Sequence, residues 1–262
     1  MGVLLLSSAS AAHHLKQNQK NLQESLNRLS SGKRITSVGD DPGGLAVAMK
    51  LNASIKRLAG SENNVQNALS YMEVQDGLLK TAGNIITRIS ELKGLHSDDP
   101  LKSTDNQASY NTELIDLVAQ LDDMKSATFN AQPLFELEHS INYDEDGDAD
   151  LTLSAAEFAL AVKGLNGASD FTALTVDTID RALQNVANLR AQNGSGQNRL
   201  QFTAESLSLQ KYNMKAALDR IEGINLAEET SNLAKHSILT QASAAMVAQA
   251  NSQNDIAMML LS

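Results

Sequence analysis

The sequence predicts an all-α protein, in which the N- and C-terminal halves of the chain form a long antiparallel helical rod or coiled coil with a small central insert. Each half carries a ladder of mostly apolar residues that recur every seven positions. Proline stands only at Pro42, Pro100 and Pro133, so no proline ring opposes a helix after position 133. These features favour a few long helices rather than many short elements.

The two ladders define the rod. The first consists of Leu51, Leu58, Val65, Met72, Leu79 and Ile86. The second consists of Ile179, Val186, Asn193, Leu200, Leu207, Met214 and Ile221, and Asn193 is its one polar member. Sustained seven-residue spacing is typical of left-handed helix–helix packing. At a rise of 1.5 Å per residue, each ladder predicts a helix of about 55–65 Å.

The other elements are shorter. Leu15, Leu22 and Leu29 mark a helix before the first ladder, which ends at the Ser-Ser-Gly step of residues 30–32. Apolar residues at helical spacing predict a return helix over 111–125. The insert, roughly 129–175, is expected to form short turns or strands and one helix at 154–163.

The two ends of the chain have an unusual composition. All Phe and Tyr residues lie between Tyr71 and Tyr212, and residues 226–262 are rich in Ala, Gln, Asn and Ser with little charge. Such helices bury little surface by themselves, so we expect both ends to be disordered until neighbouring subunits cover them. The candidate subunit-interface residues are Leu15, Leu22, Leu29, Leu226, Leu233 and Val247.

The charge balance excludes some classes of protein. The formal net charge is −10, and eight acids but no Lys or Arg lie between positions 126 and 162. This balance argues against a general nucleic-acid-binding protein, because such a protein needs a basic surface to contact phosphates. The chain has no cysteine for a disulfide or a thiolate site, and no apolar run long enough to span a membrane.

The acidic insert fits one register of a calcium-binding loop. With Asp146 as the first position, the candidate ligands are Asp146, Asp148, Asp150, the carbonyl of Thr152, and Glu157 at position twelve. Position six is Leu151, where such loops use glycine. The alternative is an acidic, solvated loop whose charge favours solubility.

No catalytic motif is present in the sequence. The five histidines lack the i, i+4 spacing of a helical zinc site, and there is no Gly-x-Ser-x-Gly elbow. We therefore expect no catalytic residues and no cofactor other than calcium.

Several motifs, in order and at both ends, resemble those of bacterial flagellins. They are the run 26–35 (LNRLSSGKRI) with the Asp40–Asp41 pair, 197–200 (QNRL), 220–222 (RIE), 227–229 (AEE), 238–242 (ILTQA), 248–251 (AQAN) and the closing 258–262 (MMLLS). The resemblance covers roughly 1–135 and 170–262. It does not extend to the insert.

The resemblance implies a structural subunit, secreted to the extracellular flagellum, that polymerises into the filament for motility. The implied segments are an N-terminal inner coiled-coil segment (1–45), N-terminal rod helices (46–128), a variable insert (129–175), a C-terminal rod helix (176–222) and a C-terminal inner coiled-coil segment (223–262). The implied partners are further copies of the chain, other flagellins, an export chaperone, the type III export apparatus, and the filament cap and hook-junction proteins. The alternatives are a hook–filament junction protein, present in few copies, and a cytosolic coiled-coil scaffold.

Arg88 and Leu92 resemble a rod-helix patch that a Toll-like immune receptor reads in some flagellins, with Glu113 on the facing return helix. The alternative for these residues is a solvated helix face with i, i+3 and i, i+4 pairs.

Overall fold

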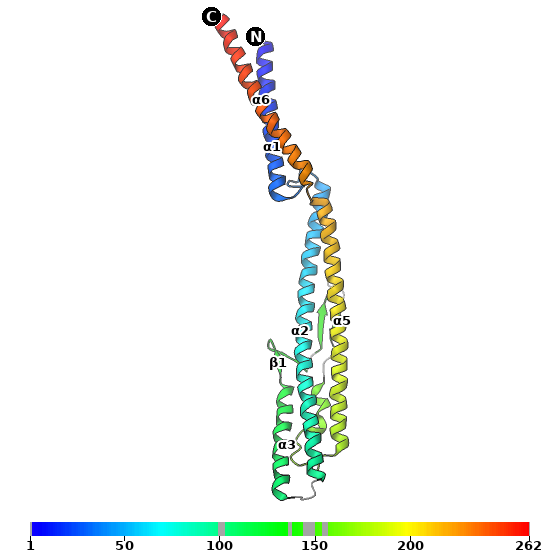
Figure 1. The fold of residues 1–262 in the computed structure, drawn as a ribbon. Coiled ribbons are helices and arrows are strands. Elements are labelled where there is room, and N and C mark those ends of the chain that lie inside the picture. Colours follow the sequence, from blue (N-terminus) through cyan, green and yellow to red (C-terminus); the bar gives the residue numbers. More distant parts are fainter. Residues whose placement is uncertain (1, 99–102, 136–137, 144–149, 154–156, 262) are drawn as a thin grey trace. The chain divides into compact units, whose positions relative to one another are not determined.

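The computed structural model describes residues 2–98, 103–135, 138–143, 150–153 and 157–261. The long helices are α1 (Gly2–Ser31), α2 (Pro42–Asp98), α3 (Thr104–Lys125), α5 (Val176–Glu222) and α6 (Leu226–Leu261) (Figure 1). The chain divides into two compact units, Met1–Ile55 with Asn213–Ser262, and Lys56–Tyr212. The prediction of an all-α fold with a small insert is confirmed.

In the unit Lys56–Tyr212, α2 and α5 run side by side in opposite directions (Figure 1). Arg190 of α5 pairs with Asp76 of α2 at 3.0 Å. A second ion pair between the same two helices joins Lys211, nearer the C-terminal end of α5, to Glu62. The two ladders face this contact: the members in this unit are buried, namely Leu58, Val65, Met72, Leu79, Ile86, Ile179, Val186, Asn193, Leu200 and Leu207. The heptad spacing therefore identified the buried stripes of both rod helices.

Asn193 interrupts its ladder because it belongs to a buried polar network. Its Nδ2 donates to Oε1 of Gln75 at 2.5 Å, and Nε2 of Gln197 donates to its Oδ1 at 2.6 Å. Gln75 in turn donates to the carbonyl of Leu134 at 2.5 Å. The network thus ties the insert to the contact between α2 and α5.

Helix α3 is the predicted return helix, extended at its N-terminal end to Thr104. Its buried face, Leu114, Val118, Leu121 and Met124, packs into the core of the unit. The insert contributes three buried aromatic rings to the same core, Phe135, Phe158 and Phe171. The rings of Phe135 and Phe158 stack with centroids 4.9 Å apart. The insert therefore completes the core that the aliphatic helices begin.

The insert contains two small antiparallel hairpins. Strands β1 (Thr128–Phe129) and β2 (Gln132–Pro133) are joined by Asn130 and Ala131, both with positive φ, as a two-residue type I′ turn requires. Strand β3 (His139–Asn142) pairs with β4 (Asp150–Leu153). The helix expected at 154–163 is shorter: α4 spans Phe158–Ala161 and gives way to the 3₁₀ helix η1 (Lys163–Leu165). Val162 and Leu165, on either side of this change, are both buried.

Candidate functional site

In the other unit, the terminal helices α1 and α6 pack along each other in opposite directions (Figure 1). Asn18 of α1 identifies the contacting faces. Its Nδ2 donates to Oγ of Ser243 at 2.8 Å and to the carbonyl of Leu239 at 3.3 Å. At steps of three and four, residues 11, 15, 18, 22, 25 and 29 of α1 and residues 233, 236, 240, 243, 247 and 250 of α6 are buried or half-buried, as in a coiled-coil seam.

Most of the predicted subunit-interface residues lie on this seam. Five of them are half-buried: Leu15, Leu22 and Leu29 on α1, and Leu233 and Val247 on α6. Leu226 is 59% exposed. The seam residues contact the other terminal helix of the same chain, so their predicted contact with a neighbouring subunit stays a prediction.

The seam is polar for a helix pair. Ser25, Glu229 and Ser243 are buried in it, and Oε1 of Glu229 and Nδ1 of His236 are buried without a hydrogen-bond partner among the described residues. Unpaired buried polar groups cost stability rather than adding to it. These unpaired groups reduce the stability that the contact between the two terminal helices contributes.

Sequence reasoning missed the large apolar side chains that point away from the seam. On α6 these are Ile238 (66% exposed), Met246 (62%) and Ile256 (55%). By the 100° step of the helix, Ile238 and Ile256 stand on the face opposite Thr240, Ser243 and Val247, and Met246 lies about a quarter-turn to the side of those three. The helical spacing of these residues is visible in the sequence, but it identifies an exposed face only once the residues of the seam are known. An exposed apolar face of this kind is typical of a surface that a partner covers.

The turn between α1 and α2 is hydrogen-bonded to the short connection between α5 and α6. Lys33 and Gly223 form an isolated β-bridge, and the amide of Arg34 donates to the carbonyl of Glu222 at 2.6 Å. The Arg34 guanidinium donates to the carbonyl of Ile221 at 2.9 Å, and Lys33 pairs with the Glu222 carboxylate at 2.6 Å. Two motifs nearly 190 positions apart in the sequence thus meet here.

Asp40 holds this turn together. Its carboxylate accepts hydrogen bonds from the amides of Ser37 (2.9 Å) and Thr36 (3.0 Å) and from the Arg28 guanidinium (3.2 Å). The two backbone bonds, that of Ser37 first, hold the pKa of Asp40 well below its usual range. At Gly223 a Cβ would lie 2.2 Å from the Asp219 carbonyl oxygen, so no larger residue fits that backbone.

The predicted receptor patch is only partly at the surface. Nε of Arg88 donates to Glu113 at 2.8 Å across the contact between α2 and α3, and Arg88 also pairs with Glu91 at i, i+3. Both partners of the interhelical pair are partly exposed. Leu92, however, is fully buried in the core, because the same turn of α2 faces α3 and the insert. Leu92 therefore presents no surface to a receptor in this structure.

Three of the five predicted calcium ligands lie among the described residues. Asp146 and Asp148 lie outside the described residues. Asp150 and Thr152 belong to β4, and Glu157 directly precedes α4. A strand, β3, leads into the loop, whereas an EF-hand enters through a helix.

Among the described residues, no three His, Asp or Glu side chains lie close enough together to hold a metal ion. In the same part of the chain, no helix is long and apolar enough to cross a membrane.

Two protein-family models match the chain: the bacterial flagellin N-terminal helical region over residues 4–139, and the bacterial flagellin C-terminal helical region over residues 176–261. A flagellin of Halalkalibacterium halodurans is 33% identical over 98% of this chain and 97% of that protein. The flagellar filament 30.7 kDa core protein of Treponema maltophilum is 31% identical over 98% of both chains. A flagellin of Bacillus subtilis is 28% identical, again over 98% of both.

Proposed function

This chain belongs to the bacterial flagellin family, and we propose that it is a structural, non-enzymatic subunit that polymerises into the flagellar filament outside the cell membrane. The observation that supports this role best is the α1–α6 pair. It combines a polar seam, with unpaired buried groups, and apolar side chains exposed outside that seam, namely Ile238, Met246 and Ile256. Copies of the same chain that cover this face would supply the stability that the pair lacks alone.

The filament also implies other partners. We propose that the chain is exported by a type III apparatus with the help of a chaperone, and that it meets the cap and hook-junction proteins and other flagellins in the flagellum. These partners rest on family membership. For a Toll-like receptor, only the exposed Arg88–Glu113 pair remains a candidate contact, because Leu92 is buried.

Seeded polymerisation tests the assembly surface. Ile238→Asp places a charge on an exposed position of α6, where burial between subunits would leave it unpaired at a cost of several kcal/mol. We expect this variant to fail to form filaments while its circular dichroism spectrum stays that of the wild type. Ile115→Asp is the control: it makes the same change at an exposed position of α3, and this variant should assemble normally. Normal filaments from Ile238→Asp would contradict an assembly role for this face.

Limited proteolysis tests the state of the ends before assembly. We expect protease to trim roughly 40 residues from each end of the monomer and to leave them intact in filaments, since local stability follows buried apolar contact. Ends that resist protease equally in both states would contradict folding on assembly.

A further inference from the structure

Three buried side-chain atoms lack a hydrogen-bond partner among the described residues, and all three lie on the terminal helices. They are Nε of Arg28 on α1, and Oε1 of Glu229 and Nδ1 of His236 on α6. Glu229 is the most unusual of these residues, because it is 7% exposed and a glutamate is rarely buried without a partner for its charge. An acceptor buried in this way lowers stability unless a donor reaches it.

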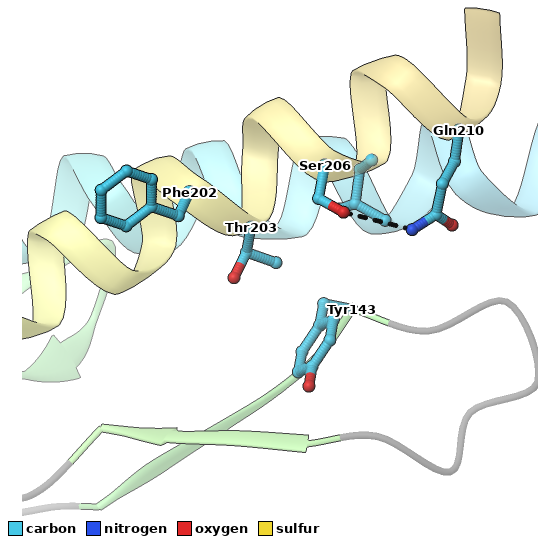
Figure 2. A pocket seen from close by; sticks show the side chains of 6 residues that line it. Tyr143, Phe202, Thr203, Ser206 and Gln210 are labelled. Carbon is cyan, nitrogen blue, oxygen red and sulfur yellow. Dashed lines mark hydrogen bonds between the residues drawn. The ribbon is translucent and has the colours of Figure 1, made fainter. Parts of the chain in front are cut away.

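The cleft between Tyr143 and α5, in the other unit, contains no such atom. Figure 2 shows the Tyr143 ring facing Thr203 and Ser206. The lining residues are Tyr143, Phe202, Thr203, Ser206, Leu207 and Gln210. Gln210 donates to Ser206 at 3.3 Å, and no buried side-chain N or O atom of the described lining lacks a partner. The unpaired atoms of the terminal helices are therefore the stronger indication of an interaction that this conformation does not make.

Arg28 and Glu229 lie at the same level of the contact between α1 and α6. On one side of this level, Asn18 donates to the carbonyl of Leu239. On the other side lies the isolated β-bridge between the turn and the connection of α5 to α6. The two helices run in opposite directions, so the position ten residues after Asn18 faces the position ten residues before Leu239. These two positions are Arg28 and Glu229.

In this structure the Arg28 side chain binds the turn. Its Nη2 donates to Oδ1 of Asp40 at 3.2 Å, while its Nε–H remains unused. Asp40 also accepts hydrogen bonds from the amides of Thr36 (3.0 Å) and Ser37 (2.9 Å) and from the Thr36 hydroxyl (3.2 Å). Asp40 can therefore lose Arg28 and keep three hydrogen bonds, whereas Oε1 of Glu229 has none.

Two other cations that follow α1 already have partners. Lys33 pairs with Glu222 at 2.6 Å, and the Arg34 guanidinium donates to the carbonyl of Ile221 at 2.9 Å. Arg28 differs from both, because one of its donors is buried and unused. Arg28 is therefore the better candidate to reach the buried carboxylate.

A move of Arg28 from Asp40 to Glu229 would pair two buried atoms and remove one of four hydrogen bonds at Asp40. The guanidinium presents Nε–H and Nη–H side by side, in a fork that fits a carboxylate. The move becomes more favourable as water leaves the helix pair, because an unpaired buried carboxylate costs more in drier surroundings. Coverage of the terminal helices by neighbouring subunits removes water in this way.

We propose that Arg28 is an ion-pair latch with two positions: it binds Asp40 in the free subunit and Glu229 once neighbouring copies cover the terminal helices. The latch fastens α1 to α6 within one chain, and it does so only in the assembled state. This inference rests on the proposed function, because assembly is what covers the helix pair.

The critical concentration for seeded assembly tests the pair. Arg28→Gln should raise it about tenfold in the wild-type chain but less than about twofold in a Glu229→Gln background, where the partner is already gone. Lys20→Gln is the control: it removes an exposed pair with Glu24 on the same helix and should change the critical concentration by less than about twofold. An effect of Arg28→Gln that is the same in both backgrounds, including no effect at all, would overturn the latch.

Electron cryomicroscopy of wild-type filaments tests the latch without any substitution. The Arg28 guanidinium should lie about 3 Å from the Glu229 carboxylate, and Asp40 should keep only its bonds within the turn. Filaments in which Arg28 stays on Asp40, or in which a cation of another subunit reaches Glu229, would overturn the latch and leave the proposed function standing. Absence of filaments from the wild-type chain would instead overturn the proposed function together with this inference.

Discussion

The network around Asn193 allows a stability prediction to be worked out from named atoms. The Asn193 side chain is 3% exposed and makes two hydrogen bonds, one to Gln75 and one from Gln197. In Asn193→Ala both are lost. Gln197 keeps the carbonyl of Met72 as a partner at 3.3 Å, but Oε1 of Gln75 is left buried without its donor. Two lost bonds at about 1 kcal/mol each, and an unpaired buried acceptor at about 1–3 kcal/mol, predict a loss of about 3–5 kcal/mol.

Urea unfolding of the full-length monomer, followed by circular dichroism, measures this loss. Asn188→Ala is the matched control, because Asn188 is an exposed asparagine on the same helix and bonds only to exposed Gln184; its effect should stay within about 0.5 kcal/mol. Gln75→Ala combined with Asn193→Ala should cost less than the sum of the single changes, because the pair is coupled. An Asn193→Ala variant as stable as Asn188→Ala would refute the network's contribution.

Three further predictions concern the turns and the insert. Ala131→Gly should stabilise the chain by about 1 kcal/mol in urea unfolding, because Ala131 has φ +63° where glycine carries no steric cost; lower stability would contradict the turn assignment. The depressed pKa of Asp40 stabilises the fold above the unfolded-state pKa of about 4, and this contribution is lost as the pH falls below it toward the folded-state pKa. Asp40→Asn should therefore flatten the dependence of stability on acidic pH, and an unchanged slope between the two proteins would contradict it. Calorimetric titration should give saturable heat at millimolar calcium that Asp146→Ala with Glu157→Ala abolishes; without such heat the insert is a solvated acidic loop.

The periodicity of the sequence determined the secondary structure of most of the chain. A seven-residue repeat is a local property, and any helix that carries it must bury that stripe. This is why the spacing alone places the ladder members from Leu58 to Ile86 and from Ile179 to Leu207 on buried faces. The break at Asn193 was visible as well. Its partners Gln75 and Gln197 were not, because a hydrogen bond between residues 118 positions apart depends on how two helices align.

The tertiary structure decided which surface each apolar stripe meets. Leu15, Leu22 and Leu29 were recognised as one face of a helix, yet only the position of α6 shows that this face is covered within the chain. The same reason applies to Leu92, which shares a helix turn with exposed Arg88 but points into the core. Spacing along one helix reports which residues lie together, and it contains no information about what lies opposite. The sequence by itself therefore determined the helices, their buried periodicity and the family, while the tertiary structure determined which apolar side chains, such as Ile238 and Phe202, remain exposed.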